Sequence, residues 1–208
     1  MCRSRNECLS KIIDVNFNYK MQSFTSDMEE CLKVLHAGGI ILYPTDTIWG
    51  IGCDATNAIA VEKIIELKQR PVNKSFVVLV SSQREVMQHI AAVDLAVFDY
   101  LETQQMPTTV IYDNAIGLAE NVLAVNGSVA MRICSDEFCK TLIKRFRNPI
   151  VSTSANISNY AAPTIFSEID TRIIQGVDYV VKYRQDETIT GSPSAIIKWN
   201  NGTFEKLR

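Results

Sequence analysis

Short apolar runs recur along the chain of 208 residues, and segments with helical periodicity separate most of them. Runs of this length that are bounded by turn residues predict buried strands. Strands that alternate with helices predict an α/β fold, and we expect one mixed sheet. The runs are "IILY" at 40–43, "SFVVLV" at 75–80, "PIVST" at 149–153, "DYVVKY" at 178–183 and "SAIIKW" at 194–199, together with 108–112 and 128–133.

Polar caps and apolar stripes mark the helices between these runs. Ser26 and Glu29 form a capping box, and Gly38-Gly39 ends the helix that they begin. Asn57 caps a second helix, which Pro71 closes. Further helices are expected at 83–90, at 94–103 and from Asp136 onwards, the last with Phe138, Leu142, Ile143 and Phe146 facing inward.

The chain reads as one domain with an appended arm. Residues 1–20 are weakly patterned, whereas regular signals begin near Ser26, so we expect an N-terminal extension over 1–20 and a single domain over 21–208. None of the six cysteines forms a C-x-x-C pair, and neither histidine lies near a cysteine pair, which argues against a zinc site or a disulfide framework. The first 20 residues lack the apolar core of a secretory signal, so none is expected, and no apolar run approaches the ~20 residues that span a bilayer. We expect a cytoplasmic protein without membrane contact.

The distribution of charge favours a small anionic ligand. The formal net charge of −2 gives no global basic field for nucleic acid or membrane. Basic side chains nevertheless gather between Lys63 and Arg84 and between Arg132 and Arg147. Two such segments in an acidic chain suit a small polyanion better than a long nucleic acid, although solvated helix faces would give the same pattern.

The stretch "YPTDTIWGIGCDA" at 43–55 contains G-x-G-x-x-A but fits a dinucleotide-binding loop poorly. Residues 54–57 separate the glycines from the next helix, and no acidic residue follows at the spacing that the ribose requires. Thr45, Asp46 and Thr47 follow Pro44 at the carboxyl end of a strand, where α/β sheets place ligands. The same residues also suit a turn that bonds its own backbone.

Two further segments carry polar groups that suit a phosphorylated ligand. Lys68, Arg70 and Lys74 surround the rigid Pro71, and such cations either grip a triphosphate or complement a helix dipole. The segment "VSTSANIS" at 151–158 places hydroxyl groups and an amide at the exit of a strand. No strongly periodic helix follows at once, which favours a polar ligand over a helix cap.

Together, "GGIILYPTDTIWGIGCDATN", "KQRP" with Lys74, "SVAMRI" and "VSTSAN" resemble the YrdC-like family of threonylcarbamoyl-AMP synthases. The resemblance implies a twisted α/β sheet around a deep, locally positive cavity, in the short, single-domain form. It also implies synthesis of threonylcarbamoyl-AMP and pyrophosphate from L-threonine, bicarbonate and ATP, for the N6-threonylcarbamoyladenosine modification of tRNA position 37. The stretch at 43–55 then becomes a substrate-binding turn whose glycines admit close backbone approach.

The resemblance also assigns roles to individual residues. Lys68 and Arg70 would be catalytic by positioning the phosphates, and no general base is identified. Mg²⁺ would bridge the ATP phosphates without a metal cage made by the protein. L-threonine would contact Thr47, Arg132, Ser154 and Ser194. ATP would contact Lys68, Arg70, Lys74, Ser128, Asn156, Thr164 and Arg208.

Some positions depart from the family pattern, and they leave two other functions open. Gln104-Gln105-Met106 stands where W-P-G is usual, and Trp49 replaces a tyrosine. One alternative is a module that binds tRNA or double-stranded RNA through the basic segment 132–147, without ATP turnover. The other is a nucleotide-binding regulatory homologue. As an enzyme, the protein would pass its adenylate to tRNA-modification proteins and would contact tRNA or double-stranded RNA in that setting.

Overall fold

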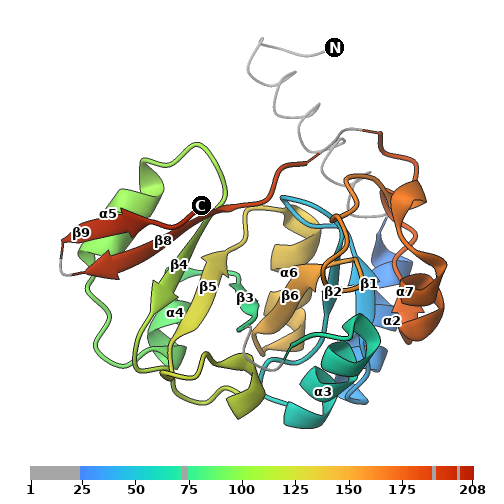
Figure 1. Cartoon of the computed structure of the whole chain (residues 1–208), viewed down its shortest axis with the longest axis horizontal. Coiled ribbons are helices and arrows are strands. Elements are labelled where there is room, and N and C mark those ends of the chain that lie inside the picture. The colour runs from blue at the N-terminus through green and yellow to red at the C-terminus, as the bar shows by residue number, and fades with distance from the viewer. Residues whose placement is uncertain (1–23, 72–74, 189–190, 201) are drawn as a thin grey trace, which may run out of the picture.

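The computed structural model describes residues 24–71, 75–188, 191–200 and 202–208. The predicted extension over 1–20 lies outside these residues. A sheet of nine strands runs through the described part in the order β7-β1-β2-β6-β3-β5-β4-β8-β9 (Figure 1). Its strands are β1 Ile41–Tyr43, β2 Gly50–Gly52, β3 Val77–Val80, β4 Thr108–Tyr112, β5 Val129–Ile133, β6 Ile150–Ser154, β7 Tyr179–Val180, β8 Ala195–Asn200 and β9 Thr203–Lys206.

The sheet is mixed, as the sequence predicts. The pairs β1–β7, β3–β5 and β4–β8 are parallel, and the other neighbours are antiparallel. The predicted strand over 178–183 contracts to the two residues of β7, and β9 is a strand that the sequence analysis missed.

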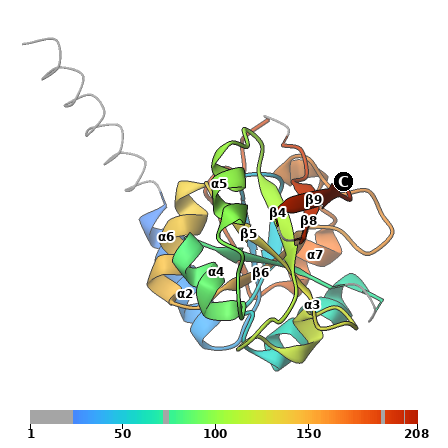
Figure 2. The same ribbon diagram turned by 90° about the vertical axis from the view of Figure 1, so that its left-hand side faces the viewer.

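Helices cover both faces of the sheet. Helices α2, α4 and α6 lie together on one side, and α3 and α7 lie on the other (Figures 1 and 2). The predicted helices over 83–90 and 94–103 are confirmed as α4 and α5, and α7 was not predicted. The helices are α2 Thr25–His36, α3 Ala58–Lys68, α4 Gln83–His89, α5 Ala96–Glu102, α6 Glu137–Phe146 and α7 Thr171–Gly176, with 3-10 turns η1 Glu120–Val122 and η2 Phe166–Glu168. No helix in the described ranges is long and apolar enough to cross a membrane.

Two of the predicted helix starts are confirmed and one is wrong. Asn57 accepts from the amides at the start of α3, and Asp136 accepts from Cys139 N at the start of α6. The Ser26–Glu29 capping box is wrong, because α2 begins at Thr25 and has no side-chain cap. Phe24, just before this helix, is buried against the rings of Phe138 and Tyr183, so aromatic packing fixes the start of the helix.

The glycines of the G-I-G segment do not lie in a substrate-binding turn, as was expected, but in β2, between β1 and β6. A Cβ at Gly52 would lie 2.6 Å from Cε1 of Tyr43 and 2.7 Å from the carbonyl oxygen of Val151. Gly52 therefore serves the close packing of two neighbouring strands, whereas Gly50 faces a cavity together with the preceding turn, 44–49.

Candidate active site

The turn 44–49 joins β1 to β2, and its hydrogen bonds determine which of its hydroxyl groups donate and which accept. The Thr45 hydroxyl donates to the carbonyl oxygen of Ile48 at 2.7 Å, which uses its single proton. The Thr45 and Thr47 hydroxyl oxygens lie 2.9 Å apart, so the Thr47 hydroxyl must donate to Thr45. The Thr47 hydroxyl can therefore accept a hydrogen bond from a ligand but cannot donate one.

Arg132 reaches this turn from the end of β5. Its Nη2 donates to Asp46 Oδ1 at 2.9 Å and to the Thr47 hydroxyl at 3.3 Å. The Arg132 side chain is 6% exposed, and its Nε is buried without a hydrogen-bond partner among the described residues. A buried donor without a partner is costly, which makes Nε a candidate contact for an anionic ligand.

A cavity of about 310 Å³, here called cavity A, lies between this turn and one face of the sheet. Six of the predicted site residues line it: Thr47, Arg70, Arg132, Ser154, Ser194 and Arg208. The described residues bring three guanidinium groups and no aspartate or glutamate side chain to its lining.

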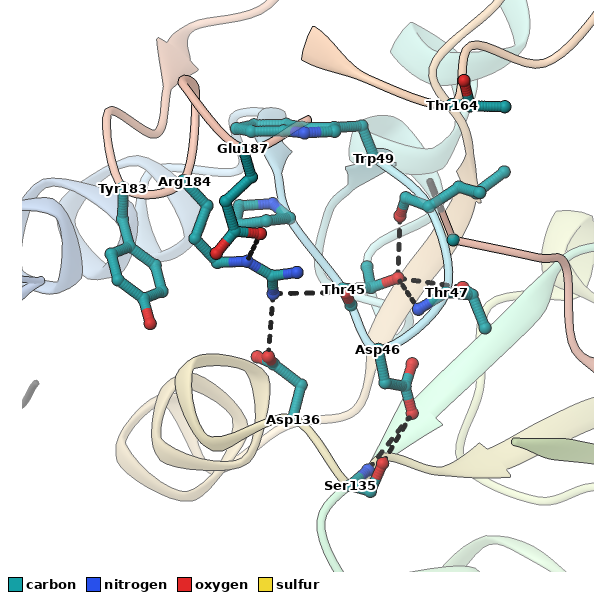
Figure 3. Close-up of a pocket in the computed structure, with 13 residues that line it drawn as sticks. Thr45, Asp46, Thr47, Trp49, Ser135, Asp136, Thr164, Tyr183, Arg184 and Glu187 are labelled. Carbon is teal, nitrogen blue, oxygen red and sulfur yellow. Dashed lines mark hydrogen bonds and ion pairs between the residues drawn. The ribbon is translucent and has the colours of Figure 1, made fainter. Parts of the chain in front are cut away.

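A second cavity of about 490 Å³, here called cavity B, lies on the other side of the same turn (Figure 3). Its wall includes Asp46, Asp136 and Glu187, together with Arg184. Arg184 donates to Thr45 O at 3.3 Å and to Asp136 Oδ2 at 3.0 Å, and it also pairs with Glu187. Cavity B thus carries more negative than positive groups, unlike cavity A.

Gly191 lines cavity B and packs against the turn 44–49, which lines both cavities. A Cβ at this position would lie 1.4 Å from the carbonyl oxygen of Thr47, closer than any non-bonded contact permits. Only glycine therefore allows the segment before β8 to pass this close to the turn.

Lys68, the last residue of α3, does not lie where the sequence analysis expected it. Its side chain is buried and lines neither cavity. Its Nζ donates to the carbonyl oxygens of Ser154 and Asn156, and at 3.3 Å to Asn156 Oδ1. These three bonds use all the protons of the ammonium group. Burial lowers the pKa of Lys68 to about 7, and the nearby Arg70 guanidinium adds to this effect.

Asn156 is likewise committed to the turn after β6 and lines neither cavity. Its Nδ2 donates to the carbonyl oxygens of Tyr160 at 2.6 Å and Ile157 at 3.1 Å, and its Oδ1 accepts from the Ser154 hydroxyl and from Lys68. Because Ser154 donates its proton to Asn156, its oxygen remains as an acceptor towards cavity A. Lys68 and Asn156 therefore hold the turn that positions Ser154 at the edge of cavity A.

Arg70 lies just beyond α3 and lines cavity A. Its Nη2 donates to the Ser75 carbonyl oxygen at 2.7 Å, and its guanidinium carbon lies 4.4 Å from the centre of the Phe76 ring. Burial lowers the pKa of this guanidinium from its ordinary value. The helix that precedes it ends at Lys68 because Gln69 adopts a left-handed conformation with φ of 50°, before Pro71 is reached. Lys74 lies outside the described residues.

Ser194 and Arg208 close cavity A from the C-terminal strands. The Ser194 hydroxyl lies 2.8 Å from that of the buried Thr109 on β4. Arg208 donates through Nε and Nη2 to the Ser194 carbonyl oxygen, at 3.1 and 3.0 Å. Thr109 was missed by the sequence analysis, because only the register of β4 beside β8 brings it to Ser194.

Besides Lys68 and Asn156, two further predicted ATP contacts lie away from cavity A. The Ser128 hydroxyl is buried at the start of β5, where it donates to Asn126 Oδ1 at 2.8 Å. Thr164 lines cavity B, and its backbone amide and hydroxyl group both donate to Glu168 Oε2. No group of three metal-binding side chains occurs in the described ranges.

Comparison with known proteins identifies the family of this chain. Residues 33–208 match the family model Sua5_yciO_yrdC, described as telomere recombination. Curated relatives include a threonylcarbamoyl-AMP synthase of Saccharophagus degradans, 34% identical over 62% of this chain and 68% of the relative. Another, from Idiomarina loihiensis, also a threonylcarbamoyl-AMP synthase, is 28% identical over 80% of this chain and 90% of the relative.

Solved structures share the fold. Sua5 of P. abyssi in complex with L-threonine superposes with a TM-score of 0.75 at 20% identity, over 87% of this chain and 53% of that one. This chain therefore spans about half the length of that Sua5. YciO of E. coli superposes with a TM-score of 0.74 at 20% identity, over 87% of both chains. The chain belongs to the Sua5/YciO/YrdC family.

Proposed function

We propose that this protein is an L-threonylcarbamoyladenylate synthase, a nucleotidyltransferase that makes threonylcarbamoyl-AMP and pyrophosphate from L-threonine, bicarbonate and ATP. The names of the curated relatives support this reaction. The product would serve the N6-threonylcarbamoyladenosine modification of tRNA position 37.

One observation carries the proposal. Cavity A collects three guanidinium groups and several hydroxyl groups from segments that are distant in the sequence. Arginine is suited to both carboxylate and phosphate, which are the charged groups of an amino acid and of ATP. A cavity of about 310 Å³ with this lining suits small polar substrates better than an RNA duplex.

In the proposed mechanism, Arg132 binds the carboxylate of L-threonine, with Nε among its donors. The acceptor oxygens of Thr47 and Ser154 face the N–H or O–H groups of the amino acid. The Ser194 hydroxyl is a further polar contact. This arrangement would fix the amine of L-threonine at one end of cavity A.

Arg70 and Arg208 would hold the phosphates of ATP at the other end. The amine and bicarbonate give a carbamate with loss of water. A carbamate oxygen then forms a bond to the α-phosphorus, and the bond from that phosphorus to the bridging oxygen breaks as pyrophosphate leaves. Positioning and charge stabilisation would supply the rate enhancement.

Lys68 takes a different role from the predicted phosphate contact. Because its three donors already hold the turn after β6, we propose that it acts through Ser154 and Asn156. Direct phosphate binding would then fall to Arg70. The roles predicted for Lys74, Ser128 and Thr164 in ATP binding stay predictions.

Mg²⁺ would accompany ATP. The described lining of cavity A offers hydroxyl and carbonyl oxygens but no aspartate or glutamate side chain, so phosphate oxygens and water would provide most ligands of the ion. When bound, the ion would neutralise phosphate charge. Proteins that accept the adenylate for tRNA modification are the proposed partners, with contact to tRNA or double-stranded RNA in that setting.

Pyrophosphate release tests the proposal. With ATP, bicarbonate and L-threonine present, release should occur, and omission of any one of them should abolish it. Release that continues without L-threonine would reject the assignment. Strongly salt-dependent RNA binding without any turnover would instead favour the RNA-binding module, and ATP binding without turnover would favour the regulatory homologue.

A further inference from the structure

The carboxylate of Asp46 lies in the turn 44–49 and is largely buried against Arg132. Its Oδ1 accepts from Arg132 Nη2 at 2.9 Å, and its Oδ2 accepts from the backbone amide and hydroxyl of Ser135 at 3.2 and 3.3 Å. Both members of the Asp46–Arg132 ion pair have side chains that are 6% exposed. Residues at the end of β5 therefore hold the Asp46 carboxylate on both of its oxygens, and the carboxylate faces the guanidinium group directly.

Asp46 and the proposed substrate contact Arg132 from different sides. Asp46 lines cavity B, where Figure 3 shows it turned towards Ser135, and it is not among the residues that line cavity A. Arg132 lines cavity A. Within the described residues, Nη2 carries all the hydrogen bonds of this guanidinium, so that Nε and Nη1 are left for a ligand.

We infer that Asp46 is a positioning residue that aims Arg132 into cavity A and thereby sets the affinity for the amino-acid carboxylate. An arginine side chain loses considerable conformational entropy when it is held in one rotamer. Because the ion pair with Asp46 already orders Arg132 in the free protein, substrate binding does not have to do so. The ion pair also compensates the buried charge of Arg132 in the empty site. This inference rests on the proposed function, because it takes Arg132 as the carboxylate contact.

Asp46→Asn tests the inference, since it keeps the size of the side chain and removes its charge. A charge-assisted hydrogen bond is roughly twice as strong as a neutral one, so L-threonine should bind about 5- to 30-fold more weakly. We expect this loss in calorimetric L-threonine binding without ATP and in the KM for L-threonine. The KM for ATP should change by less than about twofold, because Asp46 does not touch the ATP end. A purely structural defect would instead lower the fraction of active protein, without raising the KM for L-threonine more than the KM for ATP.

Asp54→Asn is the matched control. Asp54 also accepts several hydrogen bonds, among them from Thr56 N at 2.8 Å and Asn148 Nδ2 at 3.0 Å, but it lines neither cavity. L-threonine affinity should therefore stay at the wild-type value in this variant. Unchanged L-threonine affinity in Asp46→Asn, or an equal rise of both KM values, would overturn the inference.

A double-mutant cycle shows whether Asp46 acts through Arg132. In an Arg132→Met background, Asp46→Asn should change L-threonine affinity by less than about twofold, because the group that it positions is gone. Fully additive losses would overturn the inference, with melting curves establishing that each variant is folded. If the wild-type protein fails to bind L-threonine at all, the proposed function falls together with this inference. If the wild type binds and Asp46→Asn binds equally well, only the inference falls.

Discussion

Arg70 and Lys68 are two positions apart, yet the structure gives them different surroundings. Arg70 lies over the Phe76 ring and lines cavity A, whereas the ammonium of Lys68 is enclosed by the turn after β6. The left-handed Gln69 between them ends α3 and turns the chain. Residue type alone therefore does not distinguish a ligand contact from a group that holds backbone in place.

Replacement of Arg70 by alanine should impair the use of ATP far more than it impairs folding. Loss of one charge-assisted hydrogen bond to phosphate should lower kcat/KM for ATP by about 10- to 150-fold. The free energy of unfolding should change by about 1 kcal/mol or less, since the side chain lies at the edge of a cavity. Steady-state pyrophosphate release and denaturant unfolding measure the two effects. Arg172→Ala, an exposed arginine paired with Asp170, is the control that should leave turnover intact.

The turn after β6 depends on α3, because the last residue of that helix supplies the ammonium that holds it. Removal of this group in Lys68→Met should raise the KM for L-threonine and lower stability together, since Ser154 loses its supported backbone. Lys63→Met on the same helix, which removes only an exposed bond to Gly38 O, should do neither. A rise in the KM for ATP alone, at unchanged stability, would instead make Lys68 a phosphate contact.

Lys68 also predicts a pH dependence of stability. Its pKa is lowered from 10.5 to about 7 in the folded protein, so between these values the unfolded chain binds more protons at this site. The contribution of Lys68 to the free energy of unfolding should therefore rise as the pH increases from about 7 towards 10, and stay flat below about 6. Urea unfolding of the wild type and Lys68→Met at several pH values isolates this contribution. A difference between the two proteins that does not vary with pH would contradict the lowered pKa.

The segment before β8 lies against the turn 44–49 because position 191 has no side chain. Gly191→Ala should push these segments apart and weaken L-threonine binding by at least about tenfold, since Thr47 and Ser194 lie on either side of the contact. Calorimetric titration with L-threonine measures the loss. Ser192→Ala, a neighbouring exposed position, should retain wild-type affinity. Unaltered affinity in Gly191→Ala would mean that the close contact does not shape cavity A.

The extent of sequence prediction differs between the sheet and the site. Apolar runs located the long strands and the start of α6, because burial and capping are local properties of the sequence. The strand over 178–183 was predicted too long, because only the two residues of β7 pair with a neighbour, and the exposed β9 was missed, because pairing rather than burial makes it a strand. In the site, the polar turn 45–47 was visible in the sequence and the family resemblance pointed to Arg132, but neither indicated the link of Asp46 to Arg132 or of Thr109 to Ser194. Those contacts join residues more than 80 positions apart and depend on strand register.

Bound substrate should stabilise the whole molecule, because cavity A draws its lining from both halves of the chain. L-threonine at about 100 times its Kd should add roughly 2.7 kcal/mol, which for a chain of this size raises Tm by about 5 to 10 °C. Scanning fluorimetry with D-threonine as the control measures this shift. An equal shift with both enantiomers would show that the effect does not come from a stereospecific site.

The position of Arg208 has a practical consequence for protein engineering. Its backbone pairs with Ile196 and its guanidinium donates to the carbonyl oxygen of Ser194, so that Arg208 is held beside cavity A. A purification tag fused directly after Arg208 would start beside cavity A, where a run of histidines or a charged linker would compete with substrate for space and for the arginines. Kinetic constants measured with such a tag would describe the fusion rather than the enzyme, and the tag should be cleaved before substrate affinities are compared.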